Sequence, residues 1–256
     1  MVRSAVAPLN AEPNLRSEQI SQLLAGHSVE CLAEQASWLR VRTADGYEGW
    51  ANRGYLFDRA AGDPAARFSA RRLSLGCTVR EPGGPPRALP LGALLTNDDI
   101  VESGDSISLD ALPRRFPHDA GAIANSALEF FAGAPYEWGG ITPWGADCSG
   151  FVQTIFGLHG IPLPRDASKQ VELGAPVDGG LSALQPADLL FFSDRPDRRI
   201  THVALAVSHR SIVHLALGRG GYSVERLDDS QDPYVRELIE KLVVVRNYFT
   251  TESRKQ

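Results

Sequence analysis

The chain has 256 residues, of which 43% are hydrophobic and 22% charged, and its net charge is −5. This composition is typical of a globular protein of one to three domains, and the acidic balance argues against nucleic acid or a membrane surface as a partner. No run approaches the roughly 20 apolar residues of a membrane span, and the start lacks an apolar stretch of signal-peptide length. Cys31, Cys77 and Cys148 form neither a disulfide framework nor a paired metal motif, so a cytoplasmic protein is expected.

The first 115 residues have the pattern of short β-strands. Residues 38–43 (WLRVRT) and 47–51 (YEGWA) flank the turn ADG, in which glycine suits the tight position of a hairpin. Further strands are expected at 71–81, 88–96 and 105–112, with Gly/Pro-rich and polar turns between them.

Two small barrels are predicted from these closely spaced strands, the first at residues 1–60 and the second at residues 61–115. The segment DRAAGDPAARF separates them. Cys31 and Cys77 lie on predicted barrel strands, and both are expected to be buried there.

Residues 116–256 are predicted to form one α+β domain. Apolar residues recur at steps of three and four from Ala120 to Phe131, which predicts an amphipathic helix of about four turns. Helices come first and antiparallel strands follow. The expected helices are 120–131, 148–160, 165–173 and 232–242, and the expected strands are 188–192, 200–207, 211–217, 222–227 and 243–249.

Cys148 stands at the start of one of these helices, behind the lead-in YEWGGITPWGAD. Free N–H groups and the macrodipole of a helix N-terminus favour an anion, so the pKa of this thiol is expected to fall below its ordinary value of about 8.5. Small neighbours, among them Gly145, Ala146 and Gly150, leave room for a substrate backbone. The alternative is a buried core cysteine under a glycine-rich turn.

His202 and His214 lie on two consecutive predicted strands, ITHVALAV and SIVHLAL. Alternation puts each histidine on the face with smaller neighbours, where a second layer could pack. A three-residue loop at 208–210 makes the histidines diagonal neighbours, whereas one more residue would put them on opposite faces. Either histidine alone would suit a packed core. Together with Cys148 they favour a thiol–imidazole site with Cys148 as nucleophile, His202 as base and His214 orienting His202.

Separated motifs carry a family resemblance over roughly residues 117–250: YEWGG, DCSGFVQTIF, LPRDASKQ, HVALAV and IVHLA. In this order, with Cys148 and His202 54 positions apart and His214 12 beyond, they are similar to the NlpC-type bacterial cell-wall cysteine peptidases, which have a papain-like core. The resemblance implies a Cys–His–His triad without metal or cofactor. It also implies hydrolysis of the γ-D-glutamyl bond to L-lysine or meso-diaminopimelate in peptidoglycan stem peptides.

The amino-terminal half resembles bacterial Src-homology-three-like barrels. Their pairing with this catalytic domain is similar to a subgroup that trims free murein peptides with an unblocked N-terminal L-alanine, so a murein-derived peptide in cell-wall recycling is the expected partner. The resemblance assigns a first-barrel tyrosine that holds the substrate amine to Tyr47, with Tyr55 as a rival. It assigns the substrate ammonium to Asp166, which is also expected to cap the following helix.

Further substrate contacts are expected at Asp147, Ser149, Ser168 and Tyr136. Because a carboxylate beside Cys148 would raise the pKa of the thiol, the Asp147 side chain is expected to turn away and cap the helix or bind substrate backbone. Ser149 is expected either to donate to the substrate or to fill the first helical turn. Tyr136 is either a second oxyanion donor or an aromatic wall.

Three other functions remain compatible with these residues. Cysteine and histidine are zinc ligands, although no C-x-x-C or H-E-x-x-H motif occurs. A non-catalytic wall-binding protein could combine the barrels with an inactive peptidase domain. An amidase or acyltransferase could use the same thiol chemistry on another bond.

Overall fold

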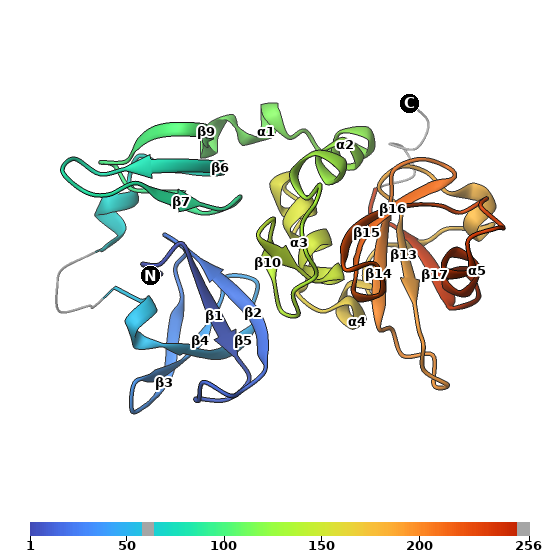
Figure 1. The fold of residues 1–256 in the computed structure, drawn as a ribbon, viewed down its shortest axis with the longest axis horizontal. Coiled ribbons are helices and arrows are strands. Elements are labelled where there is room, and N and C mark those ends of the chain that lie inside the picture. The colour runs from blue at the N-terminus through green and yellow to red at the C-terminus, as the bar shows by residue number, and fades with distance from the viewer. Residues whose placement is uncertain (58–63, 250–256) are drawn as a thin grey trace. The chain divides into compact units, whose positions relative to one another are not determined.

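The computed structural model describes residues 1–57 and 64–249, and its internal contacts divide the chain into two compact units (Figure 1). The first unit comprises residues 1–115 and 138–144, and the second comprises residues 116–137 and 145 onward. The predicted change of domain at residue 116 falls where the units change, although residues 138–144 belong to the first unit. The predicted boundary between residues 60 and 61 lies outside the described residues.

A five-stranded antiparallel sheet opens the first unit, with the order β2-β1-β5-β4-β3. Its core consists of alternating apolar side chains such as Leu9, Leu23 and Val41. The hairpin predicted around the turn at Gly46 is confirmed, but of the three strands before it only the one that carries Cys31 was expected. The strands are β1 (Val6–Asn10), β2 (Gln19–Leu24), β3 (Glu30–Gln35), β4 (Trp38–Arg42) and β5 (Glu48–Asn52).

The second sheet of this unit is built around the long strand β6, which pairs with the three other strands. The predicted strand 88–96 is divided in two, because Pro90 cannot donate to a ladder and Gly92 has a positive φ of 89°. The elements are β6 (Arg72–Arg80), β7 (Arg87–Leu89), β8 (Leu94–Leu95), β9 (Ile100–Ser108) and α1 (Leu112–Arg115), and β10 (Ile141–Thr142) also belongs to this unit.

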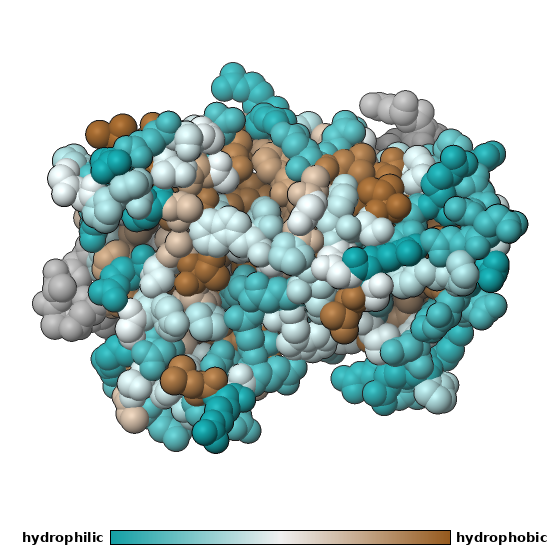
Figure 2. Space-filling view, viewed as in Figure 1, coloured by the Kyte–Doolittle hydropathy of each residue, from teal (hydrophilic) through white to brown (hydrophobic). Residues whose placement is uncertain are grey.

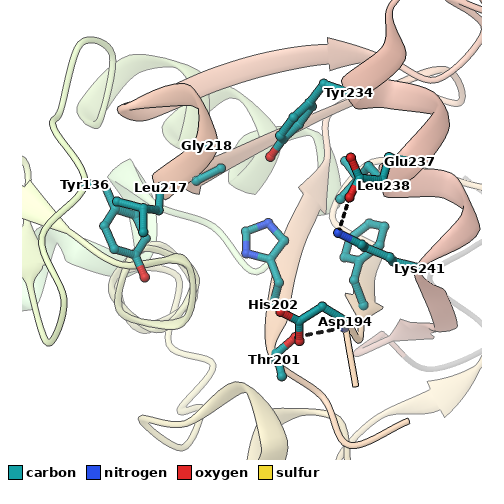
Figure 3. A pocket seen from close by; sticks show the side chains of 12 residues that line it. Tyr136, Asp194, Thr201, His202, Leu217, Gly218, Tyr234, Glu237, Leu238 and Lys241 are labelled. Atoms are coloured by element: carbon teal, nitrogen blue, oxygen red, sulfur yellow. Dashed lines mark hydrogen bonds and ion pairs between the residues drawn. The ribbon is translucent and has the colours of Figure 1, made fainter. Parts of the chain in front are cut away.

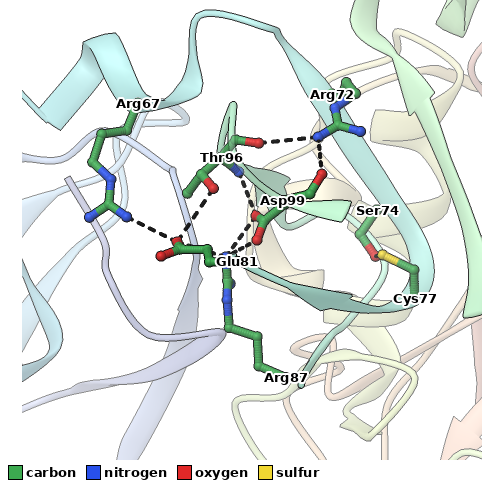
Figure 4. A network of polar contacts seen from close by, with 8 residues as sticks. All are labelled: Arg67, Arg72, Ser74, Cys77, Glu81, Arg87, Thr96 and Asp99. Atoms are coloured by element: carbon green, nitrogen blue, oxygen red, sulfur yellow. Dashed lines mark hydrogen bonds and ion pairs between the residues drawn. The ribbon is translucent and has the colours of Figure 1, made fainter. Parts of the chain in front are cut away.

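A polar network fixes the turn before β9 (Figure 4). The side chain of Asp99 is fully buried and accepts hydrogen bonds from Arg87 Nη2 at 2.6 and 2.7 Å and from the Thr96 backbone N–H at 2.7 Å. Arg72 donates to the carbonyl oxygens of Thr96 and Asp99. The carboxylate is therefore fully paired, as a buried charge requires.

The two cysteines of the first unit differ in burial. Cys77 is buried beside the Ser74 hydroxyl, as expected. Cys31 is exposed, so its predicted burial is wrong. The reason is that β3 is an edge strand, and most of its side chains face solvent.

The second unit is an α+β fold with a six-stranded sheet of order β12-β17-β13-β14-β15-β16, which confirms the predicted fold class. Strands β13 to β16 form the predicted antiparallel meander, and β17 returns to pair with β13. The strands are β11 (Gly145–Ala146), β12 (Ala175–Pro176), β13 (Leu189–Phe192), β14 (His202–Ala206), β15 (Ser211–Ala216), β16 (Gly221–Arg226) and β17 (Leu242–Asn247).

Helices cover both faces of this sheet (Figure 1): α2 and α3 lie on one side and α5 on the other. The buried side chains between the sheet and α5 include Leu190, Ala204 and Leu238. Aspartates cap three of the helices by accepting a backbone N–H. The helices are α2 (Ala120–Phe130), α3 (Cys148–Leu158), α4 (Ala167–Gln170) and α5 (Pro233–Glu240), so α2 has about three turns rather than four.

Polar side chains dominate the face shown in Figure 2, and the apolar ones form small, separate groups. Exposed large apolar residues include Trp138, Trp144 and Leu217. No helix in the described part of the chain combines the length and the apolarity that a membrane span requires.

Candidate active site

The two histidines are in direct contact in the second unit. The ladder between β14 and β15 pairs Leu205 with Val213. The Val207 N–H also donates to the Ser211 carbonyl, so residues 208–210 form the three-residue loop predicted. His202 Nε2 and His214 Nδ1 are 2.9 Å apart, within hydrogen-bonding distance. His214 is fully buried, whereas His202 is half-buried and reaches a cavity. The predicted same-face arrangement of the histidines is confirmed.

Cys148 reaches the same end of the sheet from the other side. The face of the sheet that carries the histidines packs against α5, which is the second layer expected over this face. Helix α3, which begins at Cys148, covers the opposite face. The backbone of Val203, the residue after His202, hydrogen-bonds the Cys148 thiol. Because Val203 follows His202, the first residue of β14, the thiol lies near the end of the sheet where this strand begins.

A buried carboxylate lies behind the histidines. Glu225 Oε1 is 3.5 Å from His214 Nε2, which has no closer partner among the described residues. Burial alone would raise the pKa of Glu225, but hydrogen bonds from His214, Arg219 and Ser223 hold it at about 2. Arg219 donates twice, from Nε at 2.8 Å and Nη2 at 2.9 Å, and Ser223 Oγ donates at 2.6 Å. Glu225 is therefore ionised at every ordinary pH.

This charge determines the tautomers of both histidines. An ionised carboxylate only accepts, so the hydrogen of a neutral His214 belongs on Nε2. His214 Nδ1 then accepts from the Nε2–H of His202. The remaining nitrogen of His202, Nδ1, carries a free lone pair and can act as a base.

The pKa of Cys148 contradicts the sequence-based expectation. Burial and the nearby Asp147 carboxylate raise the pKa of the thiol to about 12, against smaller opposite effects of the Val203 and Ser149 backbone and of Arg165. Desolvation, which depends on the whole fold, outweighs the helix N-terminus, which is local. Burial and His214 likewise lower the pKa of His202 to about 3. Thiol and imidazole are therefore both neutral near pH 7.

A titration of the thiolate tests this assignment. With a pKa of about 12, only about one Cys148 side chain in a thousand is ionised at pH 9. The ultraviolet absorbance difference between the protein and Cys148→Ala should stay near zero through neutral pH and rise only above about pH 9. A full thiolate signal between about pH 5 and 8 would instead indicate a preformed thiolate–imidazolium pair.

The side chain of Asp147 caps α3, as expected, and joins a buried ion pair, although its charge still raises the pKa of the thiol. It caps α3 by accepting the Gly150 N–H at 2.8 Å. Arg165, which is also buried, donates to its two oxygens at 3.0 and 2.6 Å. The Ser149 hydroxyl donates to Asp147 and accepts from Arg165, so its hydrogen already has an acceptor within the protein. Gln170 Nε2 donates to the Ser149 carbonyl and ties α4 to the start of α3.

Tyr136 lies against the start of β16. Its N–H donates to the Gly220 carbonyl at 3.1 Å, and a Cβ on Gly221 would come within 2.3 Å of the Ala134 oxygen, so only glycine allows this approach. The ring lines the cavity next to His202 (Figure 3). Burial and the nearby Cys148 raise the pKa of the Tyr136 hydroxyl well above its ordinary value, so it keeps a hydrogen to donate.

The other predicted contacts are distributed over the two units. Asp166 is half-buried just before α4, and its side chain makes no capping hydrogen bond, so the predicted capping is wrong. In this one-turn helix, the Asp166 carbonyl instead accepts from Lys169 and Gln170. Ser168 is half-buried on α4. Tyr47 belongs to the first unit, and the substrate roles of all three residues stay predictions.

No role was predicted for Arg165 or Glu225, although the sequence pattern around each residue indicates one. Arg165 stands inside the motif LPRDASKQ, where only the aspartate was considered. Glu225 alternates with Ser223 on β16, and Ser223 is directly opposite His214 in the ladder. A carboxylate that shares a face with two histidines could have been inferred from the strand pattern YSVERL.

Comparisons with known proteins agree with this architecture. Residues 133–238 match the NlpC/P60 family, and residues 6–57 match a bacterial SH3 domain. The crystal structure of an NlpC/P60 family protein from Bacillus cereus has the same fold, with a TM-score of 0.78 at 20% identity, covering 97% of this chain and 99% of that one.

Two curated relatives extend over most of the chain. A Bacillus cereus protein named gamma-D-glutamyl-L-lysine dipeptidyl-peptidase is 37% identical over 245 residues, which cover 85% of this chain and 72% of the relative. A Lysinibacillus sphaericus protein named dipeptidyl-peptidase 6 is 28% identical over 278 residues, covering 97% and 99%. With this identity and coverage, the chain belongs to the NlpC/P60 family, and its NlpC/P60 domain follows a bacterial SH3-like module.

Proposed function

We propose that this protein is a cysteine endopeptidase that hydrolyses the γ-D-glutamyl–diamino acid bond of peptidoglycan stem peptides with a free N-terminal L-alanine. The names of its relatives support a hydrolase that acts on peptidoglycan peptides. The observation that carries the proposal is the 2.9 Å hydrogen bond between His202 and His214 at the end of the sheet where the Cys148 thiol also lies.

Acylation begins from a neutral thiol. As the Cys148 sulfur attacks the γ-carbonyl carbon, its proton passes to Nδ1 of His202, and the carbonyl π electrons move onto oxygen. When the tetrahedral intermediate collapses, the C–N bond breaks and His202 gives the proton to the leaving amine. The diamino acid departs, and the γ-glutamyl group remains on Cys148 as a thioester.

Water completes the reaction. His202 takes a proton from the water as its oxygen attacks the thioester carbon, and returns it to sulfur as the C–S bond breaks. In both steps His202 keeps its Nε2–H directed at His214 Nδ1, and the ionised Glu225 holds the hydrogen of His214 on Nε2, so Nδ1 of His202 stays available for the proton. The backbone N–H of Cys148 and the Tyr136 hydroxyl are the proposed oxyanion donors, and one such donor contributes about 2.7–4 kcal/mol.

The proposal includes cell-wall peptide recycling in the cytoplasm. The three cysteines are free, and one of them, Cys31, is exposed, which suits a reducing compartment. A free N-terminal alanine is typical of a murein peptide released from its glycan.

Product analysis tests the proposed bond. The protein is incubated with L-Ala-γ-D-Glu-L-Lys, with the corresponding meso-diaminopimelate tripeptide and with their tetrapeptides, and the products are identified by mass spectrometry. Release of L-Ala-D-Glu by the protein but not by Cys148→Ala is expected. Cleavage of a different bond would indicate an amidase, and peptide binding without cleavage would indicate a wall-binding protein.

The free amine of the substrate is expected to matter. N-acetylation of the L-alanine should lower kcat/KM by roughly 10- to 100-fold, because hydrogen bonds to a charged group contribute about 1.5–3 kcal/mol. Matched free and acetylated tripeptides are compared by steady-state kinetics. Equal rates would contradict the roles assigned to Asp166 and Tyr47 while leaving the peptidase chemistry intact.

A further inference from the structure

A cavity of about 230 Å³ lies directly beside His202 in the second unit (Figure 3). It is formed at the ends of β13, β14 and β15 and along α5. This volume is below the roughly 300–1,000 Å³ of pockets that hold drug-sized ligands, so it suits a single amino acid residue. Among the predicted substrate contacts, Tyr136 lines this cavity, whereas Asp147, Ser149, Asp166 and Ser168 do not.

The polar groups of this cavity carry both signs of charge. Asp194 is oriented by the Thr201 hydroxyl, which donates to its carboxylate at 2.9 Å. Lys241, which also lines the cavity, donates from Nζ to Glu237 Oε1 at 2.6 Å. Their side chains are 38% and 63% exposed, so both remain accessible to a ligand. Two carboxylates therefore face one ammonium group.

Apolar side chains line other parts of the cavity. Phe192, Ala216, Leu217 and Leu238 line the space, and Leu217 is 75% exposed at its edge. The cavity thus combines apolar walls with charged groups near His202. A methylene chain with a charged end has the complementary chemistry.

The position of His202 identifies which part of the substrate would enter. In the proposed reaction, His202 gives its proton to the amine that leaves, so the residue carrying that amine lies next to the imidazole. The leaving residue is a diamino acid. L-Lysine ends in an ammonium alone, whereas meso-diaminopimelate ends in an ammonium and a carboxylate.

We propose that this cavity binds the leaving diamino acid and prefers meso-diaminopimelate, with Lys241 pairing with its distal carboxylate and Asp194 with its distal ammonium. This inference rests on the proposed function and names the substrate class of the same site. The distal ammonium of L-lysine would pair with Asp194, but this side chain has no distal carboxylate to pair with Lys241. Discrimination between the two diamino acids thus depends on one cation.

The test compares kcat/KM for the two L-Ala-γ-D-Glu tripeptides, which differ only in the diamino acid. The protein is expected to favour the meso-diaminopimelate tripeptide. Lys241→Met should lower kcat/KM for that substrate by roughly 10- to 100-fold and leave the L-lysine tripeptide unchanged, whereas Lys241→Arg should retain the preference. Asp194→Asn should reduce both substrates by a similar factor, since both carry the distal ammonium.

A matched control is Arg210→Met, which removes an exposed cation from the opposite end of β15 and should alter neither substrate. If Lys241→Met lowered kcat/KM equally for both tripeptides, this lysine would pair with the α-carboxylate that both share, and the preference would be overturned. If neither Lys241→Met nor Asp194→Asn lowered kcat/KM for either tripeptide, the proposed site itself would be overturned. Hydrolysis of neither tripeptide by the unaltered protein would instead contradict the proposed function.

Discussion

Replacing Cys148 with alanine is expected to lower the rate of peptide hydrolysis by a factor of roughly 10⁴ to 10⁶, leaving what binding and the oxyanion donors alone provide. Without the sulfur, no thioester forms, and His202 has no proton to transfer to the leaving amine. Single-turnover kinetics with the meso-diaminopimelate tripeptide measure the loss, because they separate the chemical step from product release.

Two further measurements make this result specific. The exposed Cys31 provides the matched control, and Cys31→Ala should leave the rate unchanged. Trapping of a peptidyl thioester by acid quench, followed by mass spectrometry, should locate the acyl group on Cys148. Activity retained in Cys148→Ala, or an acyl group on another residue, would contradict the mechanism.

Arg165→Met is expected to lower the free energy of unfolding by about 3–5 kcal/mol, because it leaves the buried Asp147 carboxylate without its partner. The side chains of Arg165 and Asp147 are only 2% and 8% exposed, so water cannot replace the lost contact. Urea unfolding followed by circular dichroism measures the shift in the midpoint.

The double variant Asp147→Asn/Arg165→Met separates charge from packing. It removes both charges and keeps an asparagine that can still cap α3, so it should recover most of the loss. Arg226→Met, which breaks the exposed ion pair with Asp228, should leave the midpoint unchanged. A double variant as unstable as Arg165→Met would show that packing of the guanidinium, not pairing of the carboxylate, stabilises the start of α3.

The histidine pair could be predicted because it depends on local rules. Side-chain direction alternates along a strand, and a three-residue loop fixes the register between two neighbouring strands. Both rules operate within residues 200–217, and the 2.9 Å contact between His202 and His214 follows from them. The start of α3 at Cys148 is likewise local, because Asp147 is a preferred capping residue.

The charged partners of Asp147 and His214 could not be predicted as readily. Arg165 is 18 positions from Asp147, and Glu225 reaches His214 only because β16 packs beside β15. Composition and periodicity reveal neither the Arg165–Asp147 contact nor the Glu225–His214 contact. Cys31 shows the same limit, since its strand was expected but its place at the edge of the sheet was not.

The sequence by itself determined the order of the elements, the helix that begins at Cys148 and the strand face shared by the two histidines. Only the tertiary structure decided the protonation of the site, because desolvation depends on everything packed around a group. Burial raises the pKa of Cys148 to about 12, lowers that of His202 to about 3, and keeps Glu225 ionised through donors from β16 and its neighbouring turn. The neutral thiol and the tautomer of its base are therefore properties of the whole fold.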